Sequence, residues 1–484
     1  MKTKENRITK TFRMVNIIVL LFIQLTIFGC QHKDSLLFPV DKYTVQTKDI
    51  QTSLGKRSVV YKSYLLIPYV ANPVYKDYQC LNVFVPVKID NKNIDVTNAP
   101  ILFNIGVGGY MSVNNEKAKE MNYRSDLALA AGYIVVSPGC RGRDNKDSNG
   151  KNYGKAPAAI VDLKAAVRYI RHNKGRIPGN TERIISVGCS AGGALSALLG
   201  TCGNSDLYDS YLKEIGAADE KDNIYASACY SPITDLENAD MAYEWMYGLL
   251  PTKDGMVNQN LSEQLKTKYP DYLLSLNLTG KDDFGAITAD NYKDYLLKYY
   301  LFPSLSGYLK NLSPEKLEIY LKSNPWIMKK NENVTFTFDA YLKHIGRMKG
   351  LPAFDDFEKH SPETELFGND SINSRHFTTF SLSFETKLDN AKIDDDLNTK
   401  VNMMNAMYFI INKNQGCANY WWLRNGTSDN HTSQTVMINL ATKLQNTNKS
   451  VNTQLFWDGG HCADNDPEGF IKWIENITGY TMQN

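Results

Sequence analysis

The sequence has no excess of charge of either sign, no long apolar run and few histidines. Lys and Arg number 54 against 52 Asp and Glu, so the overall balance offers no surface for a polyanion, and we expect no nucleic-acid partner. No P-loop, metal-ligand cluster or internal repeat is present, and we therefore expect no cofactor and no metal ion. With 484 residues, of which 43% are hydrophobic, the chain can nevertheless bury a large core.

The most apolar stretch, residues 14–28, follows a basic segment and closes on Gly29 and Cys30. Its about 15 apolar residues fall short of the ~20 that a spanning helix needs, so it predicts a signal peptide over residues 1–29. A permanent membrane anchor is the alternative. The Gly-Cys ending resembles a bacterial lipoprotein signal, in which Cys30 becomes the lipidated first residue, although secretion with cleavage elsewhere stays open. We expect an exported protein, tethered to a membrane by that lipid in the periplasm or at the cell surface, where disulfides can form.

Apolar, β-rich runs alternate with helical patterns along most of the chain. The clearest helix covers residues 157–172, with Ile160, Leu163, Val167 and Ile170 on one face. This alternation predicts an α/β fold, with a mostly parallel, eight-stranded sheet and helices on both faces. The expected strands are residues 59–70, 81–89, 100–105, 133–137, 184–187, 224–230, 420–423 and 453–457.

The alternation stops over residues 235–398, which are rich in Tyr, Lys, Asp and Leu. Helical stretches at residues 290–300 and 314–321 and the aromatic content favour an inserted lid domain over a pocket. An insertion that only decorates the surface is the alternative. The catalytic core is then expected in two parts, residues 30–234 and 399–484.

One serine lies at a tight turn between a strand and a helix. Gly188-Cys189-Ser190-Ala191-Gly192 follows the apolar run 184–187 and precedes a helical stretch. Glycines at such a turn let the backbone bend sharply and lift the serine hydroxyl above the sheet edge. The pattern predicts a nucleophile elbow, with Ser190 as the nucleophile.

A serine nucleophile needs a base and an acid that orients the base. Among seven histidines, His461 is the candidate base because it follows the last strand in a glycine-rich loop. Asp429 is the candidate acid because it follows the preceding strand and its turn, whereas Asp458 is expected to cap or solvate the histidine loop. The order serine, aspartate, histidine is that of the α/β-hydrolase fold.

Two backbone N–H groups should bind the negative charge that develops on the substrate oxygen. Ala191 supplies one, and the loop of residues 106–110 supplies the other, from Gly108, Gly109 or Tyr110. Cys189 precedes the serine and Cys462 follows the histidine, so a disulfide between them would tie the two catalytic loops together. Two unrelated thiols are the alternative.

Several motifs resemble those of bacterial tannases and their relatives, over most of the chain. They are the elbow itself and residues 137–144, 231–235, 242–245 and 424–429. Separately, the Cys-Ser, Asp and His-Cys arrangement is similar to that of fungal-type tannases and feruloyl esterases, in which the two cysteines are disulfide-linked. Both resemblances imply an α/β-hydrolase with a large lid that cleaves esters of phenolic acids.

In the bacterial tannases, a lid lysine, a lid glutamate and an aspartate two residues after the triad aspartate bind the galloyl hydroxyls. By resemblance, Lys349 and Glu363 are the first two, while His431 stands at the third position. A neutral imidazole can still accept a hydrogen bond, but one carboxylate of the pattern is missing. A weaker tannase, or an esterase for another hydroxylated aromatic acid, fits equally well.

We therefore expect an exported, tannase-like or feruloyl-esterase-like serine esterase acting on small-molecule esters of aromatic acids. An acetyl or carbohydrate esterase on the same scaffold is one alternative, and a non-catalytic surface binding protein is another. A prolyl-oligopeptidase-like peptidase shares the order of the triad, but no long repeat-bearing segment precedes the sheet.

Overall fold

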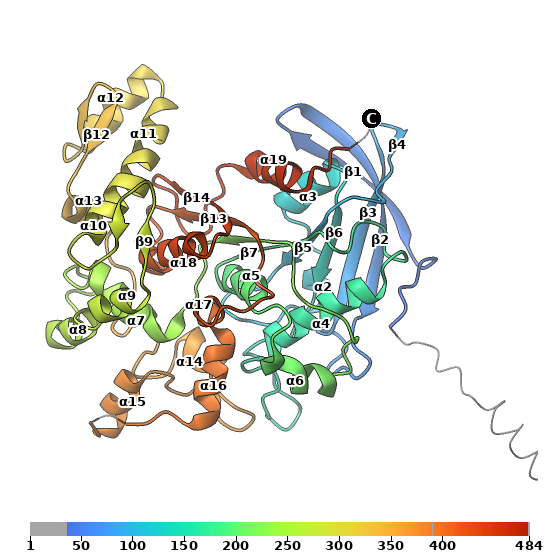
Figure 1. The fold of residues 1–484 in the computed structure, drawn as a ribbon, viewed down its shortest axis with the longest axis horizontal. Helices are drawn as coiled ribbons and strands as arrows, with labels where there is room; N and C mark the ends of the chain where they lie inside the picture. Colours follow the sequence, from blue (N-terminus) through green and yellow to red (C-terminus); the bar gives the residue numbers. More distant parts are fainter. Residues whose placement is uncertain (1–35, 390, 483–484) are drawn as a thin grey trace, which may run out of the picture. The chain divides into compact units, whose positions relative to one another are not determined.

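The computed structural model describes residues 36–389 and 391–482. The chain divides into two units, residues 1–37 and 38–484, and the second unit carries the sheet and its helices (Figure 1). The expected signal peptide and Cys30 lie outside the described residues. Within the described part, no helix combines the length and the apolar character needed to cross a bilayer.

A ten-stranded sheet forms the centre of the second unit, in the order β1-β2-β3-β6-β5-β7-β8-β13-β14, with β4 paired to β3. From β6 to β14 all neighbouring strands are parallel, whereas β1, β2 and β3 are added antiparallel at one end. The strands are β1 Thr44–Thr52, β2 Gly55–Pro68, β3 Cys80–Ile89, β4 Lys92–Asn93, β5 Ile101–Ile105, β6 Ile134–Pro138, β7 Ile184–Cys189, β8 Ala226–Tyr230, β13 Tyr420–Gly426 and β14 Ser450–Phe456.

All eight expected strands are present, and the predicted α/β class with a mostly parallel sheet is confirmed. The sheet has two strands more than the expected eight. β1 carries no apolar alternation, because of its side chains only that of Ile50 is buried. An edge strand of this kind leaves no periodic signal in the sequence.

Helices cover both faces of the sheet. Ile185 and Val187 of β7 pack in an apolar cluster with α3 (Tyr123–Ala130) and α19 (Pro467–Thr478). Ser186, between them, hydrogen-bonds Ser196 of α5 (Ala191–Thr201) at 2.7 Å. Because successive strand residues point to opposite faces, α3 and α19 cover one face and α5 covers the other. The other helices of the core are α2 Asn115–Ala118, α4 Ala158–His172, η1 Asp206–Tyr208, α6 Asp209–Glu214 and α18 Gln434–Asn446.

The helix expected over residues 157–172 is α4, with Pro157 at its N-cap. The four apolar residues assigned to one face are all buried, and α4 packs against α5. Its periodicity therefore predicted both its boundaries and its buried face.

Between β8 and β13 the chain forms a mainly helical segment (Figure 1). The helices expected near residues 290–300 and 314–321 are present, the first as a short helix that continues through a π-helical turn. The elements are α7 Leu236–Tyr247, α8 Gln259–Lys266, α9 Tyr269–Ser275, α10 Tyr292–Leu296, η2 Leu297–Leu301, α11 Phe302–Lys310, α12 Pro314–Ser323, α13 Phe338–Ile345, α14 Pro362–Leu366, α15 Thr379–Thr386, α16 Asp395–Met404 and α17 Ala406–Ile411, with the small hairpins β9 Thr279–Gly280 with β10 Gly285–Ala286 and β11 Met328–Lys330 with β12 Asn333–Thr335.

Buried carboxyl groups join the two ends of this segment. Asn405, at the start of α17, donates to Asp235 Oδ1 at 3.0 Å and to Glu237 Oε1 at 2.5 Å. Tyr272 of α9 also donates to Asp235. Burial raises the pKa of Glu237 to about 8, and the nearby Asp235 contributes to that shift. Asp235 and Asn405, 170 residues apart in sequence, are thus hydrogen-bonded where the segment leaves and rejoins the core.

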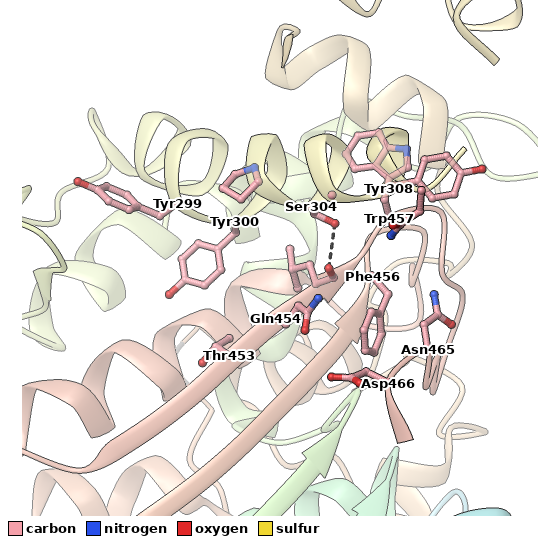
Figure 2. A pocket seen from close by; sticks show the side chains of 14 residues that line it. Tyr299, Tyr300, Ser304, Tyr308, Thr453, Gln454, Phe456, Trp457, Asn465 and Asp466 are labelled. Atoms are coloured by element: carbon pink, nitrogen blue, oxygen red, sulfur yellow. Dashed lines mark hydrogen bonds between the residues drawn. The ribbon is translucent and has the colours of Figure 1, made fainter. Parts of the chain in front are cut away.

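A cleft of about 440 Å³ lies between the segment and the edge strand β14. Ser304 of α11 donates to the Leu455 carbonyl at 2.9 Å, and both residues line this cleft. Figure 2 marks this hydrogen bond at Ser304 with a dashed line. Aromatic and amide side chains line it, among them Tyr299, Tyr300, Tyr308, Gln454, Phe456, Trp457 and Asn465.

Candidate active site

Ser190 stands between the end of β7 and the start of α5, with φ 60° and ψ −125°. This strained backbone fits only because the surrounding positions are glycines. A Cβ atom on Gly188 would lie 2.2 Å from the Gly192 carbonyl oxygen, and one on Gly193 would lie 2.7 Å from the Tyr230 carbonyl oxygen. The elbow therefore has the tight geometry that its glycine spacing predicts.

The loop after β5 packs directly against the N-terminus of α5. Gly192 N–H donates to the Val107 carbonyl at 3.0 Å, and a Cβ on Gly192 would lie 2.7 Å from that oxygen. Gly109 and Tyr110 both have positive φ, and the Tyr110 hydroxyl donates to the Ile233 carbonyl at 2.7 Å. Ala191, as the first residue of α5, has an N–H with no intrahelical acceptor. The candidate oxyanion donors of Ala191, Gly108 and Gly109 thus belong to two segments in direct contact.

Asp429 and His461 come together at the carboxyl ends of β13 and β14. The two strands are parallel neighbours, with Gly426 opposite Phe456, so the loops that follow them meet. His461 Nδ1 lies 3.0 Å from Asp429 Oδ2, and Asp429 is 0% exposed. A buried carboxylate in this position fixes the imidazole tautomer with the proton on Nδ1 and leaves Nε2 free to accept a proton.

Ser190 Oγ forms no hydrogen bond with any described residue. Both it and His461 are half-buried at the same end of the sheet. Hydrogen bonds of this kind often tighten only when a substrate binds.

A disulfide and a serine hold the histidine loop against the elbow. Cys189 and Cys462 are bonded, with their Cα atoms 5.7 Å apart and a sequence separation of 273. Cys462 N–H also donates to Ser231 Oγ at 3.0 Å, directly after β8. Ser231 begins the motif of residues 231–235, but the sequence assigned it no role, because only the tertiary contact shows it.

The disulfide sulfurs and a ring nitrogen of His461 lie within 4.8 Å of one another. In the described part of the chain this is the one group of such side chains close enough to share a metal ion. Because the thiolate is the form of cysteine that binds metal, sulfurs joined in a disulfide make a poor metal site.

His431 lies against the base. The rings of His431 and His461 stack at 4.1 Å between centroids, with 12° between their planes. The main-chain N–H of His431 donates to Asp429 Oδ1 at 3.1 Å, so one carboxylate holds the His461 ring and the His431 backbone. Burial, and then the nearby His461, lower the pKa of His431.

Half-buried Lys349 and buried Glu363 interact electrostatically close to this stack. Lys349 Nζ lies 3.6 Å from the centre of the Phe354 ring. Burial lowers the pKa of Lys349, while the charges of Glu363, Asp240 and Asp429 act against that shift. Glu363 is 5% exposed, burial raises its pKa, and its Oε2 is buried without a hydrogen-bond partner among the described residues. Such an oxygen is an acceptor that a bound hydroxyl could satisfy.

Asp458 binds the inserted segment instead of only capping or solvating its own loop. Its Oδ1 lies 2.8 Å from His344 Nε2, and its Oδ2 accepts from the Tyr320 hydroxyl at 2.6 Å. Both partners come from helices between β8 and β13. The loop that carries His461 is therefore joined to that segment, a contact that no local sequence pattern reveals.

Comparison with solved structures finds close similarity over nearly the whole chain. The tannase of Fusobacterium nucleatum is 37% identical, with a TM-score of 0.80, over 92% of this chain and 99% of that one. A tannin acyl hydrolase in complex with ethyl gallate is 32% identical, with a TM-score of 0.81 and the same coverage. The native tannin acyl hydrolase from Lactobacillus plantarum is 31% identical, again with a TM-score of 0.81 and the same coverage.

Sequence comparison finds narrower matches. The family model described as BD-FAE matches residues 88–269. Esterase LipQ of Mycobacterium tuberculosis is 28% identical over 157 residues, which cover 31% of this chain and 32% of that esterase. The chain thus spans about a third of the length of that curated relative. The residues matched by the family model include Ser190.

Proposed function

The chain belongs to the tannase family of α/β-hydrolases and is a carboxylic ester hydrolase, and on this premise we propose that it cleaves esters of hydroxylated aromatic acids, of the gallic or hydroxycinnamic type. The observation that carries the proposal is the pairing of half-buried Lys349 with buried Glu363, whose Oε2 has no hydrogen-bond partner among the described residues. Burying a charged pair is costly unless its remaining polar atoms find partners. Phenolic hydroxyls can donate to Glu363 and accept from Lys349, which acetyl and other plain acyl groups cannot do. Relatives have been solved with ethyl gallate and with 3,4-dihydroxybenzoate.

The proposed reaction is a two-step acyl transfer. Ser190 Oγ attacks the ester carbonyl while His461 Nε2 takes its proton, and Asp429 stabilises the imidazolium that forms. Ala191 N–H and a donor from Gly108 or Gly109 bind the oxyanion. The imidazolium then protonates the departing alcohol. In the second step His461 activates water, which releases the acid and restores Ser190.

Three further expectations belong to this proposal. The helical segment over residues 235–398 acts as a lid, because it supplies Lys349 and Glu363 and contacts the base loop through Asp458. His431 borders the acyl site and can donate or accept one hydrogen bond. The enzyme is exported, and Cys30 carries a lipid that tethers it to the membrane.

Hydrolysis of methyl gallate, methyl ferulate and 4-nitrophenyl acetate, measured side by side, tests the substrate class. We expect turnover of at least one aromatic ester with a higher kcat/KM than that of the acetate, and loss of all turnover in Ser190→Ala. Ser371→Ala, the same change at an exposed serine, is the matched control and should leave rates unchanged. Turnover of the acetate without either aromatic ester would refute the aromatic substrate class and favour an acetyl or carbohydrate esterase. Wild-type rates in Ser190→Ala would refute the serine mechanism.

A further inference from the structure

His461, the proposed base, is held by few polar contacts, although it must transfer a proton in a fixed direction. Among residues 36–389 and 391–482, its ring makes one hydrogen bond, the 3.0 Å contact from Nδ1 to Asp429. It follows Gly459 and Gly460, and its side chain is 20% exposed. A single hydrogen bond fixes one ring atom but allows the ring to turn about that bond, which would move Nε2 away from Ser190.

The stacked ring of His431 restricts this rotation of the His461 ring. A parallel ring at 4.1 Å is close to van der Waals contact across a whole face, so the imidazole cannot tilt toward it. The backbone of His431 is itself held, since its main-chain N–H donates to the other oxygen of Asp429. The disulfide sulfurs near a ring nitrogen of His461 limit the movement of that ring further. The Asp429 carboxylate therefore holds the His461 ring and the His431 backbone, and the two stacked rings restrict each other.

We propose that His431 is a positioning residue for the catalytic base, whose neutral aromatic face holds the plane of the His461 imidazole. This role rests on the proposed function of His461 and is separate from any contact that His431 makes with substrate. It applies to every ester that the enzyme cleaves, including those without phenolic hydroxyls.

The charges around His431 favour the neutral ring that this role needs. Burial and the positive charges of His461 and Lys349 lower its pKa, while Asp429 alone acts in the other direction. A neutral aromatic face beside the imidazolium formed in the reaction is favourable, whereas a second cation at that distance would oppose it.

The test uses 4-nitrophenyl acetate, whose acyl group offers no hydroxyl to residue 431. His431→Ala should lower kcat about tenfold with KM within about twofold, as expected when a base loses its alignment but substrate binding persists. His431→Phe keeps a flat ring and should recover kcat to within about threefold of wild type.

Two further variants complete the design. His360→Ala is the matched control, because His360 is exposed and lies outside the site; it should leave kcat unchanged. Should His431→Ala unfold, His431→Gln removes the aromatic face while keeping a polar side chain, and the same loss of kcat is expected.

Unchanged kcat on the acetate in His431→Ala or His431→Gln, with Ser190→Ala inactive, would overturn the positioning role and leave the serine esterase intact. Failure of His431→Phe to recover activity would overturn the stacking argument. Equal turnover by wild type and Ser190→Ala would overturn both this inference and the proposed function.

Discussion

Removal of the Cys189–Cys462 disulfide should cost both stability and turnover. The bridge joins residues 273 apart in sequence. For a loop of that length, the chain-entropy relation gives a contribution of about 5.6 kcal/mol to the free energy of unfolding, while measured bridges typically contribute ~2–4 kcal/mol. A chain of this size unfolds with an entropy of about 1 kcal/mol per kelvin, so this loss lowers Tm by about 2–6 °C. Because the bridge ends beside Ser190 and His461, we also expect kcat to fall about 10- to 100-fold through loss of their alignment.

Thermal unfolding and ester hydrolysis of the double variant Cys189→Ala/Cys462→Ala measure the two effects. Reducing agent should lower the Tm of the wild type in the same way and leave the double variant unaffected. Cys417→Ala removes a cysteine that is free in the structure and serves as the control. Wild-type Tm and kcat in the double variant would refute the argument, whereas a lower Tm with unchanged kcat would refute only the link to alignment.

Three other changes have expected results. Lys349→Met and Glu363→Gln should each lower kcat/KM for methyl gallate about 10- to 100-fold and change kcat/KM for 4-nitrophenyl acetate by less than about threefold, because only the aromatic acid offers hydroxyls to this pair. Equal losses on both esters would contradict the assignment. Gly192→Ala should abolish activity, since its Cβ would lie 2.7 Å from a carbonyl oxygen, whereas Gly307→Ala, where nothing lies within 4 Å, should be neutral or stabilising in a helix. The raised pKa of Glu237, about 8 against 4.5, means that its contribution to stability is present below about pH 4.5 and is lost as the pH rises toward about 8. Glu237→Gln should therefore flatten the fall in urea stability over that range and make the protein more stable than wild type at pH 8. Parallel pH curves for the two proteins would contradict this.

The sequence predicted the parts of the fold that local patterns encode. The parallel strands are continuous apolar runs, so each gave a signal, whereas the polar edge strand β1 gave none. Glycine spacing predicted the turn at Ser190 because each glycine there meets a neighbouring carbonyl oxygen. The proximity of Asp429 and His461 followed from chain order, since both come directly after adjacent parallel strands.

The contacts that support the site could not be predicted, because they join distant segments. Ser231 binds the Cys462 N–H across 231 residues, and Asp458 binds His344 across 114 residues. The stacking of His431 on His461 likewise depends on how two loops meet. From the sequence, His431 was only a histidine at a position where the bacterial tannases have an aspartate. The structure adds its stacking contact with His461, on which the proposed positioning role rests.

The most direct test of the central claim is covalent labelling of the wild-type enzyme with a fluorophosphonate, followed by mass mapping of the modified peptide. We expect a single modification, on Ser190. Methyl gallate should slow the rate of this labelling in proportion to its occupancy of the site. Ester hydrolysis that continues after labelling, or a label on another serine that abolishes activity, would contradict the claim that Ser190 is the nucleophile of an aromatic-acid esterase.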